Sequence, residues 1–92
     1  MNNSDLDKQC PPSLVVCPST VVGHWMSEIS RFFPGGSIFR AVKYAGQAKK
    51  RKELWNKWCL QHHNIVVTSY SVLRNDVELL SSKGWLYCIL DE

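Results

Sequence analysis

The sequence predicts an α/β fold in which a parallel sheet is covered by helices on both faces. Short apolar runs of strand length occur four times, and a longer segment separates each run from the next. In these separating segments apolar residues recur at helical spacing, and Pro or Gly lies at several of the junctions. Continuous apolar strands that alternate with helices are typical of parallel sheets with right-handed crossovers. The expected order is therefore β-α-β-α-β-α-β.

The first unit consists of a strand over Ser13–Cys17 and a helix that runs to about Phe33. The strand segment is short, apolar and partly β-branched, and Pro18 ends it. Ser19 or Thr20 can then act as the N-cap of the helix. The apolar residues of this helix recur at steps of three and four and predict one core-facing side: Val22, Trp25, Met26, Ile29, Phe32 and Phe33.

The second unit begins after the turn Pro34-Gly35-Gly36, with a strand over Ile38–Tyr44 that ends at Ala45-Gly46. A helix over Gln47–Gln61 follows, with the basic block Lys49–Lys52 near its start. Four bases at a helix N-terminus oppose the helix dipole, so local helix stability does not favour them there. Two interpretations remain open, a solvated helix face or a surface that attracts the phosphate groups of a partner.

The third unit is a buried strand over Asn64–Thr68 and a helix over Tyr70–Ser81, for which Ser69 can serve as the cap. Gly84 ends this unit, and a fourth apolar strand, also expected to be buried, covers Leu86–Leu90. The apolar side chains of the helix that are expected to face the core are Val72, Leu73, Val77 and Leu80.

Length and composition indicate one small domain or a piece of a larger one. The chain has 92 residues, of which 45% are apolar, with four tryptophans and a net charge of +3. Residues 1–12 are polar and end in two prolines, so we expect a flexible lead-in before a domain over residues 13–92. No apolar run approaches the ~18–20 residues of a membrane span, and no secretory signal is visible. We therefore expect an intracellular protein without a membrane partner.

The cysteines and histidines do not predict a metal site. The four cysteines include no CxxC pair, and His24, His62 and His63 lack the ligand pairs that a zinc site needs. Cys17 and Cys88 lie inside apolar runs, so we expect them to be buried free thiols.

Asp91 and Glu92 follow the fourth apolar strand directly. The carboxyl edge of a parallel sheet is where α/β folds bind ligands, and nucleotide hydrolases hold Mg²⁺ there with carboxylates. Taken alone, the pair is explained as well by a chain that leaves the core. A Gly-rich loop ending in Gly-Lys-Ser/Thr is absent, as is any GxGxxG segment. This chain alone is therefore expected to bind ATP poorly and not to hydrolyse it.

The turns after the first three strands all offer hydroxyl groups or backbone amides. They are Pro18-Ser19-Thr20, Tyr44-Ala45-Gly46 and Thr68-Ser69-Tyr70. Each is explained as ordinary helix capping when taken singly. Because all three lie at one edge of the predicted sheet, beside a basic block, together they favour a track for a phosphate backbone.

Four segments resemble motifs of the Swi/Snf-type ATPases, members of helicase superfamily two, over about Pro12 to Glu92. Residues 12–25 are similar to motif Ia, Tyr44-Ala45-Gly46 to motif Ib, Ile65–Tyr70 to motif Ic and Tyr87–Glu92 to motif II. This resemblance implies part of a first RecA-like lobe from an ATP-driven translocase on double-stranded DNA. Motif I, the residues after motif II and the second lobe lie outside the match.

The resemblance also implies roles for single residues, carried over by position. Asp91 would hold Mg²⁺ through water, Glu92 would be the catalytic carboxylate, and Trp25 would pack the helix that follows motif Ia. ATP and magnesium are thus expected in the intact parent protein, with neither bound tightly by this chain alone. The residues expected to line the DNA side are Pro18, Ser19, Thr20, Gly46, Thr68 and Ser69.

A narrower resemblance points to the ATPases associated with TATA-binding protein. It rests on Gly23-His24-Trp25, Val72–Asp76 and Tyr87–Glu92, while Ser71 departs from the acidic residue more common in that subgroup. It implies a nuclear protein that acts on complexes of TATA-binding protein with DNA. The alternative function is a non-catalytic α/β module that binds DNA or protein.

Overall fold

The computed structural model describes residues 11–34, 40–61 and 63–92. Most of the expected lead-in therefore lies outside the described residues. The same holds for Cys10, for Gly35-Gly36 and for the start of the second expected strand at Ile38.

Four strands and the intervening helices follow one another in the predicted order. The elements are β1 (Ser13–Cys17), a 3₁₀ turn η1 (Ser19–Val21), α2 (Val22–Phe32), β2 (Ala41–Lys43), α3 (Ala48–Gln61), β3 (Ile65–Ser69), α4 (Tyr70–Asn75), α5 (Val77–Ser81) and β4 (Cys88–Leu90). The expected alternation of strands and helices is confirmed, with one predicted helix divided into α4 and α5.

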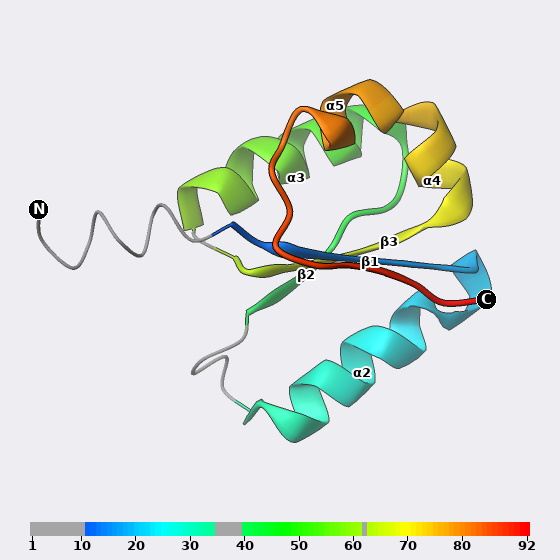
Figure 1. Cartoon of the computed structure of the whole chain (residues 1–92), viewed down its shortest axis with the longest axis vertical. Coiled ribbons are helices and arrows are strands. Elements are labelled where there is room, and N and C mark those ends of the chain that lie inside the picture. The colour runs from blue at the N-terminus through cyan, green and yellow to red at the C-terminus, as the bar shows by residue number, and fades with distance from the viewer. Residues whose placement is uncertain (1–10, 35–39, 62) are drawn as a thin grey trace, which may run out of the picture.

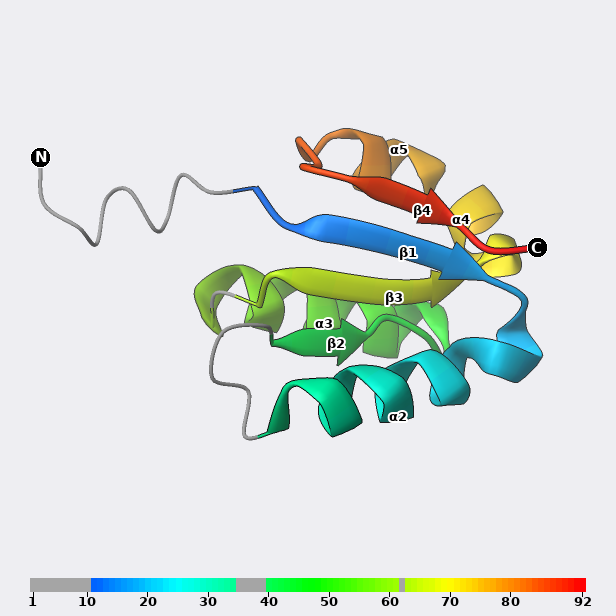
Figure 2. The same ribbon diagram turned by 60° about the horizontal axis from the view of Figure 1, so that its bottom comes forward.

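The strands form one parallel sheet in the order β2-β3-β1-β4 (Figure 2). Val15 at the centre of β1 lies opposite Val67 of β3 on one side and Ile89 of β4 on the other. Because all strands run in one direction, their carboxyl ends meet at a single edge. The predicted α/β class is confirmed, and the arrangement matches part of a RecA-like lobe.

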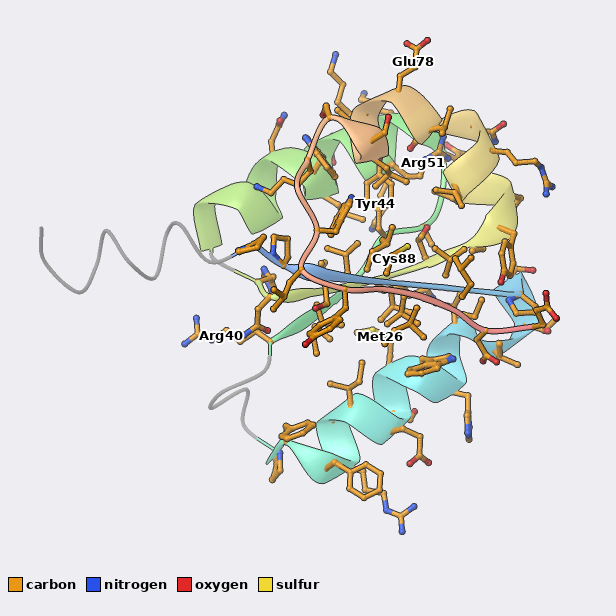
Figure 3. The ribbon with its side chains drawn as sticks, viewed as in Figure 1. Met26, Arg40, Tyr44, Arg51, Glu78 and Cys88 are labelled. Atoms are coloured by element: carbon orange, nitrogen blue, oxygen red, sulfur yellow. The ribbon has the colours of Figure 1, made fainter. Side chains whose placement is uncertain are left out.

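Helices cover both faces of the sheet, as predicted. Helix α2 lies against one face, whereas α3, α4 and α5 lie against the other (Figure 1). Alternate residues of a strand point to opposite faces, so Val15 packs towards α2 while Val16 packs towards α3 and α4. Figure 3 shows Met26 of α2 between its helix and the sheet. Two apolar layers therefore sandwich the sheet.

Strand β4 differs from the expectation of a buried strand. It pairs only with β1 and lies at the edge of the sheet, and the side chains of Cys88, Ile89 and Leu90 are exposed. Leu90 is 60% exposed, whereas Cys17 in the central strand is fully buried. The expectation of a buried thiol is thus correct for Cys17 and wrong for Cys88. An edge strand lacks the second neighbour that would cover its side chains.

The start of α2 also differs from its prediction. No side-chain hydrogen bond from Ser19 or Thr20 caps the helix, because both residues lie within the 3₁₀ turn that precedes it. The N–H of Val21 donates instead to the carbonyl of Pro18 at 3.0 Å. At the other end of α2, Phe32 and Phe33 are 66% and 37% exposed, so the prediction that they belong to the core-facing side is wrong for both.

The predicted helix over Tyr70–Ser81 begins as expected but is interrupted at Asp76. The hydroxyl of Ser69 accepts the N–H of Val72 at 3.2 Å, which confirms Ser69 as the cap. Asp76 departs from helical geometry, with φ −111° and ψ 25°, where its side chain is bound by neighbouring elements. The turn between α4 and α5 leaves Val77 half exposed, contrary to the prediction, while Val72 and Leu80 are buried. Among the helices of the described residues, none combines the length and hydrophobicity that crossing a membrane requires.

Candidate functional site

The carboxyl edge of the sheet brings the predicted site segments into one row. In sheet order these are Gly46 after β2, Thr68-Ser69 at the end of β3, Pro18–Thr20 after β1 and Asp91-Glu92 after β4. Neighbouring strands lie about 4.8 Å apart, so the row extends over roughly 14 Å. Segments up to about 70 residues apart in sequence thus meet at one edge, as parallel strands dictate.

Asp91 is fixed at its backbone and at its side chain. Its N–H donates to the carbonyl of Val16 at 2.8 Å, which continues the β1–β4 ladder by one residue. The hydroxyl of Tyr70 donates to the Asp91 carbonyl at 3.2 Å. The indole N–H of Trp25 donates to Asp91 Oδ2 at 2.8 Å. Trp25 therefore packs the helix after motif Ia, as expected, and also orients the predicted metal carboxylate, which the sequence did not suggest.

The Tyr70 hydroxyl and the Cys17 thiol, which lie near this carboxylate, both have raised pKa values. Burial raises the pKa of the Tyr70 hydroxyl, and the carboxylates of Glu92 and Asp91 raise it further. Burial likewise raises the pKa of the Cys17 thiol, with a second contribution from Asp91. In both shifts burial is the larger cause, and the smaller contribution reflects the negative charge of the carboxylates at the end of β4.

The donor set at this edge fits magnesium held together with phosphate groups. No three His, Cys, Asp or Glu side chains gather into a metal cluster in the part of the chain that the structure describes. Mg²⁺ does not require such a cluster, since it commonly binds through one or two carboxylates, waters and the phosphates of a substrate. Asp91 and Glu92 supply hard oxygen ligands of this kind.

The turn after β1 presents three exposed candidate residues. Pro18, Ser19 and Thr20 are all exposed at the edge of the sheet, and neither hydroxyl serves as a helix cap. Their hydroxyl groups and backbone are therefore accessible to an approaching phosphate.

Thr68 and Ser69 use their hydroxyl groups inside the fold. Thr68 is fully buried, and its Oγ1 donates to the carbonyl of Tyr44 at 2.7 Å. Ser69 is 4% exposed, and its Oγ caps α4 and lies 3.1 Å from the Oγ of Ser71. Ser71, which departs from the subgroup pattern, is exposed, so the pair of hydroxyl groups that it forms with Ser69 reaches the surface.

Gly46 forms the turn after β2 with a left-handed backbone, at φ +100°. Glycine adopts this conformation without steric cost. The carbonyl of Gly46 accepts a hydrogen bond of 2.7 Å from Nη1 of Arg51. The turn is therefore held in place from within the protein while the residue itself is exposed.

Arg51 belongs to a polar cluster that the sequence did not reveal. Its Nε and Nη2 donate to Asp76 Oδ2 and Oδ1 at 2.7 and 3.0 Å, and the hydroxyl of Tyr44 donates to the same Oδ2 at 2.6 Å. Arg51 and Tyr44 lie between the sheet and the helices above it (Figure 3). Hydrogen bonding by Arg51 lowers the pKa of Asp76, and burial raises the pKa of Tyr44. The available signal was that Arg51 is the single arginine in a block that otherwise consists of lysines, shortly after the Gly46 turn.

The basic block is consequently not one uniform surface. Arg51 is 9% exposed and structural, whereas Lys49, Lys50 and Lys52 are exposed. The side chain of Lys50 runs past Gly46, where its Cγ would lie 3.7 Å from a Cβ built at that glycine. Three lysines therefore remain as candidates for a phosphate partner next to the Gly46 turn.

The sequence pattern of the SNF2-related domain matches residues 1–92. This chain belongs to the SNF2-related family. The resemblance to Swi/Snf-type ATPases that the four motifs predicted is thereby confirmed.

Individual relatives of this SNF2-related chain are much longer proteins. It is 44% identical over 81 residues to the TATA-binding protein-associated factor BTAF1 of Arabidopsis thaliana, which covers 88% of this chain and 4% of that protein. It is 37% identical over 87 residues to the TATA-binding protein-associated factor MOT1 of Saccharomyces cerevisiae, and this match covers 95% of this chain and 4% of MOT1. Helicase SWR1 of Mycosarcoma maydis is 37% identical to it over 82 residues, which cover 88% of this chain and 4% of that helicase. The chain thus spans about 4% of the length of these relatives.

Proposed function

We propose that this chain is a segment of an ATP-dependent DNA translocase, carrying DNA-contacting turns and the Asp-Glu pair of its Mg-ATP site. The observation that carries the proposal is the single row at the carboxyl edge of the sheet. Three turns of the kind that contact phosphates lie there beside Asp91-Glu92, in a chain of the SNF2-related family. Such proximity suits an enzyme in which DNA contact and nucleotide hydrolysis influence each other.

At the nucleotide end of the row, we assign Asp91 to Mg²⁺, through water, and Glu92 to the attacking water. Bound Mg²⁺ supplies charge neutralisation at the phosphates. Trp25 and Tyr70 keep Asp91 in one orientation, and the exposed Glu92 lies next to it. The phosphates themselves need backbone amides and a lysine of a Gly-rich loop, which these residues do not provide.

At the DNA end of the row, we assign Pro18, Ser19, Thr20 and Gly46 to direct contact with a phosphate backbone. Their exposure supports this role. The buried hydroxyls of Thr68 and Ser69 are engaged within the fold, so these residues would act through their backbone and through the shape of the turn. Lys49, Lys50 and Lys52 would add electrostatic attraction.

The names of the relatives support a more specific role for the parent protein. Two of them are TATA-binding protein-associated factors. We infer that the parent acts in the nucleus on complexes of TATA-binding protein with double-stranded DNA, and that contacts with TATA-binding protein come from regions other than this chain.

DNA binding is tested by fluorescence anisotropy with a labelled duplex at a series of salt concentrations. Binding through phosphates is expected to weaken steeply between about 50 and 200 mM salt, because each neutralised phosphate releases counterions. Lys50→Gln is expected to reduce the slope of log K against log salt by about 0.9. Lys57→Gln, an exposed lysine farther along α3, is the matched control and leaves the slope unchanged. Binding that ignores salt would contradict phosphate contact.

Nucleotide hydrolysis is tested by phosphate release from ATP with and without duplex DNA. We expect this chain to release none, because it lacks the Gly-Lys-Ser/Thr loop. DNA-stimulated release that disappears in Asp91→Asn would show that these residues hydrolyse ATP unaided and would refute that expectation.

A further inference from the structure

Asp91 is held from both faces of the sheet. Trp25 of α2 reaches it from one face through the indole N–H, 2.8 Å from Oδ2. Tyr70, the first residue of α4, reaches it from the other face through a hydroxyl 3.2 Å from its carbonyl oxygen. Together with the bond to Val16, the bond from Tyr70 holds the backbone of Asp91, and the bond from Trp25 orients its carboxylate.

The two donors are partly buried and pack against the apolar layers of the sheet. Trp25 lies against the apolar layer of Val15, Cys17 and Val67, beneath one face of the sheet. Tyr70 packs against the layer on the opposite face, which contains Val16 and Val66. An indole N–H can only donate a hydrogen bond. Trp25 therefore needs an acceptor as its partner, and the Asp91 carboxylate is one.

Each donor lies close in sequence to one of the turns proposed to contact DNA. Helix α2, which carries Trp25, begins at Val22, with only Val21 between it and the turn of Pro18–Thr20. Tyr70 follows Ser69 without an intervening residue. A displacement of either turn would therefore act on a side chain that is hydrogen-bonded to Asp91.

The geometry points to Trp25 and Tyr70 as positioning residues that link the two DNA-contacting turns to the magnesium carboxylate. This inference rests on the proposed function. Hydrogen-bond partners of metal-ligating groups orient those groups, and their loss commonly weakens metal binding by about 10–100-fold. A carboxylate has about four acceptor sites, so the bond from Trp25 leaves capacity for a metal-bound water.

The hydrogen bond is tested by NMR of the indole N–H groups in the isotope-labelled full chain, with Trp25→Phe identifying the Trp25 signal. Asp91→Ala is expected to move the Trp25 proton upfield, because a charge-assisted hydrogen bond is lost. Glu92→Ala, the matched control on the adjacent carboxylate, leaves it near its wild-type position. Equal shifts in the two variants would overturn the assignment of Trp25.

The effect on the metal is tested with Mn²⁺ as the probe, by paramagnetic broadening of the signals around Asp91, which also detects the weak binding expected of this chain in the absence of phosphates. Trp25→Phe and Tyr70→Phe keep their aromatic rings, and each is expected to weaken Mn²⁺ binding about tenfold. Trp85→Phe is the control, because the Trp85 indole donates elsewhere, to the carbonyl of Leu80. Circular dichroism verifies folding, and the two variants are independent tests. Unchanged Mn²⁺ affinity in both would overturn the inference, whereas no Mn²⁺ binding by the wild-type chain would refute the proposed metal role together with it.

The link to DNA is tested by measuring Mn²⁺ affinity with and without duplex DNA. Coupling between sites is reciprocal, so DNA is expected to change Mn²⁺ affinity and Mn²⁺ to change DNA affinity by the same factor. The double variant Trp25→Phe/Tyr70→Phe is expected to bind DNA while losing this coupling. Independent binding of the two ligands by the wild-type chain would overturn the link and leave the proposed function intact. A wild-type chain that binds no DNA would refute the proposed function itself.

Discussion

The guanidinium of Arg51 and the carboxylate of Asp76 form a two-pronged ion pair beneath the Gly46 turn. The paired atoms lie 2.7 and 3.0 Å apart, and the side chains are only 10% and 16% exposed. Arg51 also binds the carbonyl of Gly46, and Asp76 also accepts the hydroxyl of Tyr44. One pair therefore joins α3, the α4–α5 junction and the turn after β2.

Arg51→Met is expected to destabilise the fold by about 3 kcal/mol, since it leaves the Asp76 carboxylate without its cation in a largely buried site. The measurement is the midpoint of urea unfolding. Lys49→Met changes a neighbouring but exposed base of the same block, so its effect is expected to stay within about 0.5 kcal/mol. Similar effects of the two substitutions would contradict a structural role for Arg51.

Acid is expected to weaken the fold through Asp76. Its pKa is lowered by the hydrogen bonds from Arg51 and Tyr44, while burial acts in the opposite direction. The folded state therefore binds fewer protons than the unfolded state, and the stabilisation is complete above the unfolded value of 3.8. It is lost as the pH falls from about 4 through the lower folded pKa.

Urea unfolding at a series of acidic pH values measures this effect. Asp76→Asn is expected to remove the part of the pH dependence that Asp76 contributes. Glu78→Gln, at an exposed acid two residues away, is expected to retain it. An identical pH dependence in wild type and Asp76→Asn would show that the ion pair does not cause the acid sensitivity.

Gly46→Ala is expected to destabilise the fold by roughly 1–2 kcal/mol, because φ of +100° is unfavourable for a residue with a Cβ. The new methyl group would meet Lys50 at an ordinary 3.7 Å, so backbone conformation causes the effect. Gly23→Ala, in α2 with open space around it, is expected to stabilise by up to about 1 kcal/mol. A lower urea midpoint for Gly46→Ala and a higher one for Gly23→Ala, both relative to wild type, would bear this out. An unchanged midpoint in Gly46→Ala would count against it.

Leu80→Ala is expected to cost about 3 kcal/mol, because Leu80 is 1% exposed and its removal opens a cavity. Its neighbour Leu79 is 36% exposed, so Leu79→Ala is expected to cost less than about 1 kcal/mol. Denaturation of the two variants side by side provides the comparison. Equal losses would mean that α5 does not pack as the structure has it.

Local patterns predicted β1 and β3 well because both strands are central and buried on both faces, which produces continuous apolar runs. The same rule failed at β4, which has an equally apolar sequence but lies at the sheet edge. Sequence periodicity reports what a segment is able to bury, and the neighbouring elements decide what it does bury. The predicted burial of Val77 and Phe32 was wrong for the same reason.

The sequence by itself determined the order of the elements and the edge at which Asp91, Glu92 and the three turns meet. Both follow from local apolar patterns and from the common direction of parallel strands. Only the tertiary structure decided that Trp25 orients Asp91, that Arg51 pairs with Asp76 and that Tyr70 reaches the Asp91 carbonyl. These partners are 66, 25 and 21 residues apart, and crossovers in the fold bring them within hydrogen-bond distance, which no local pattern records.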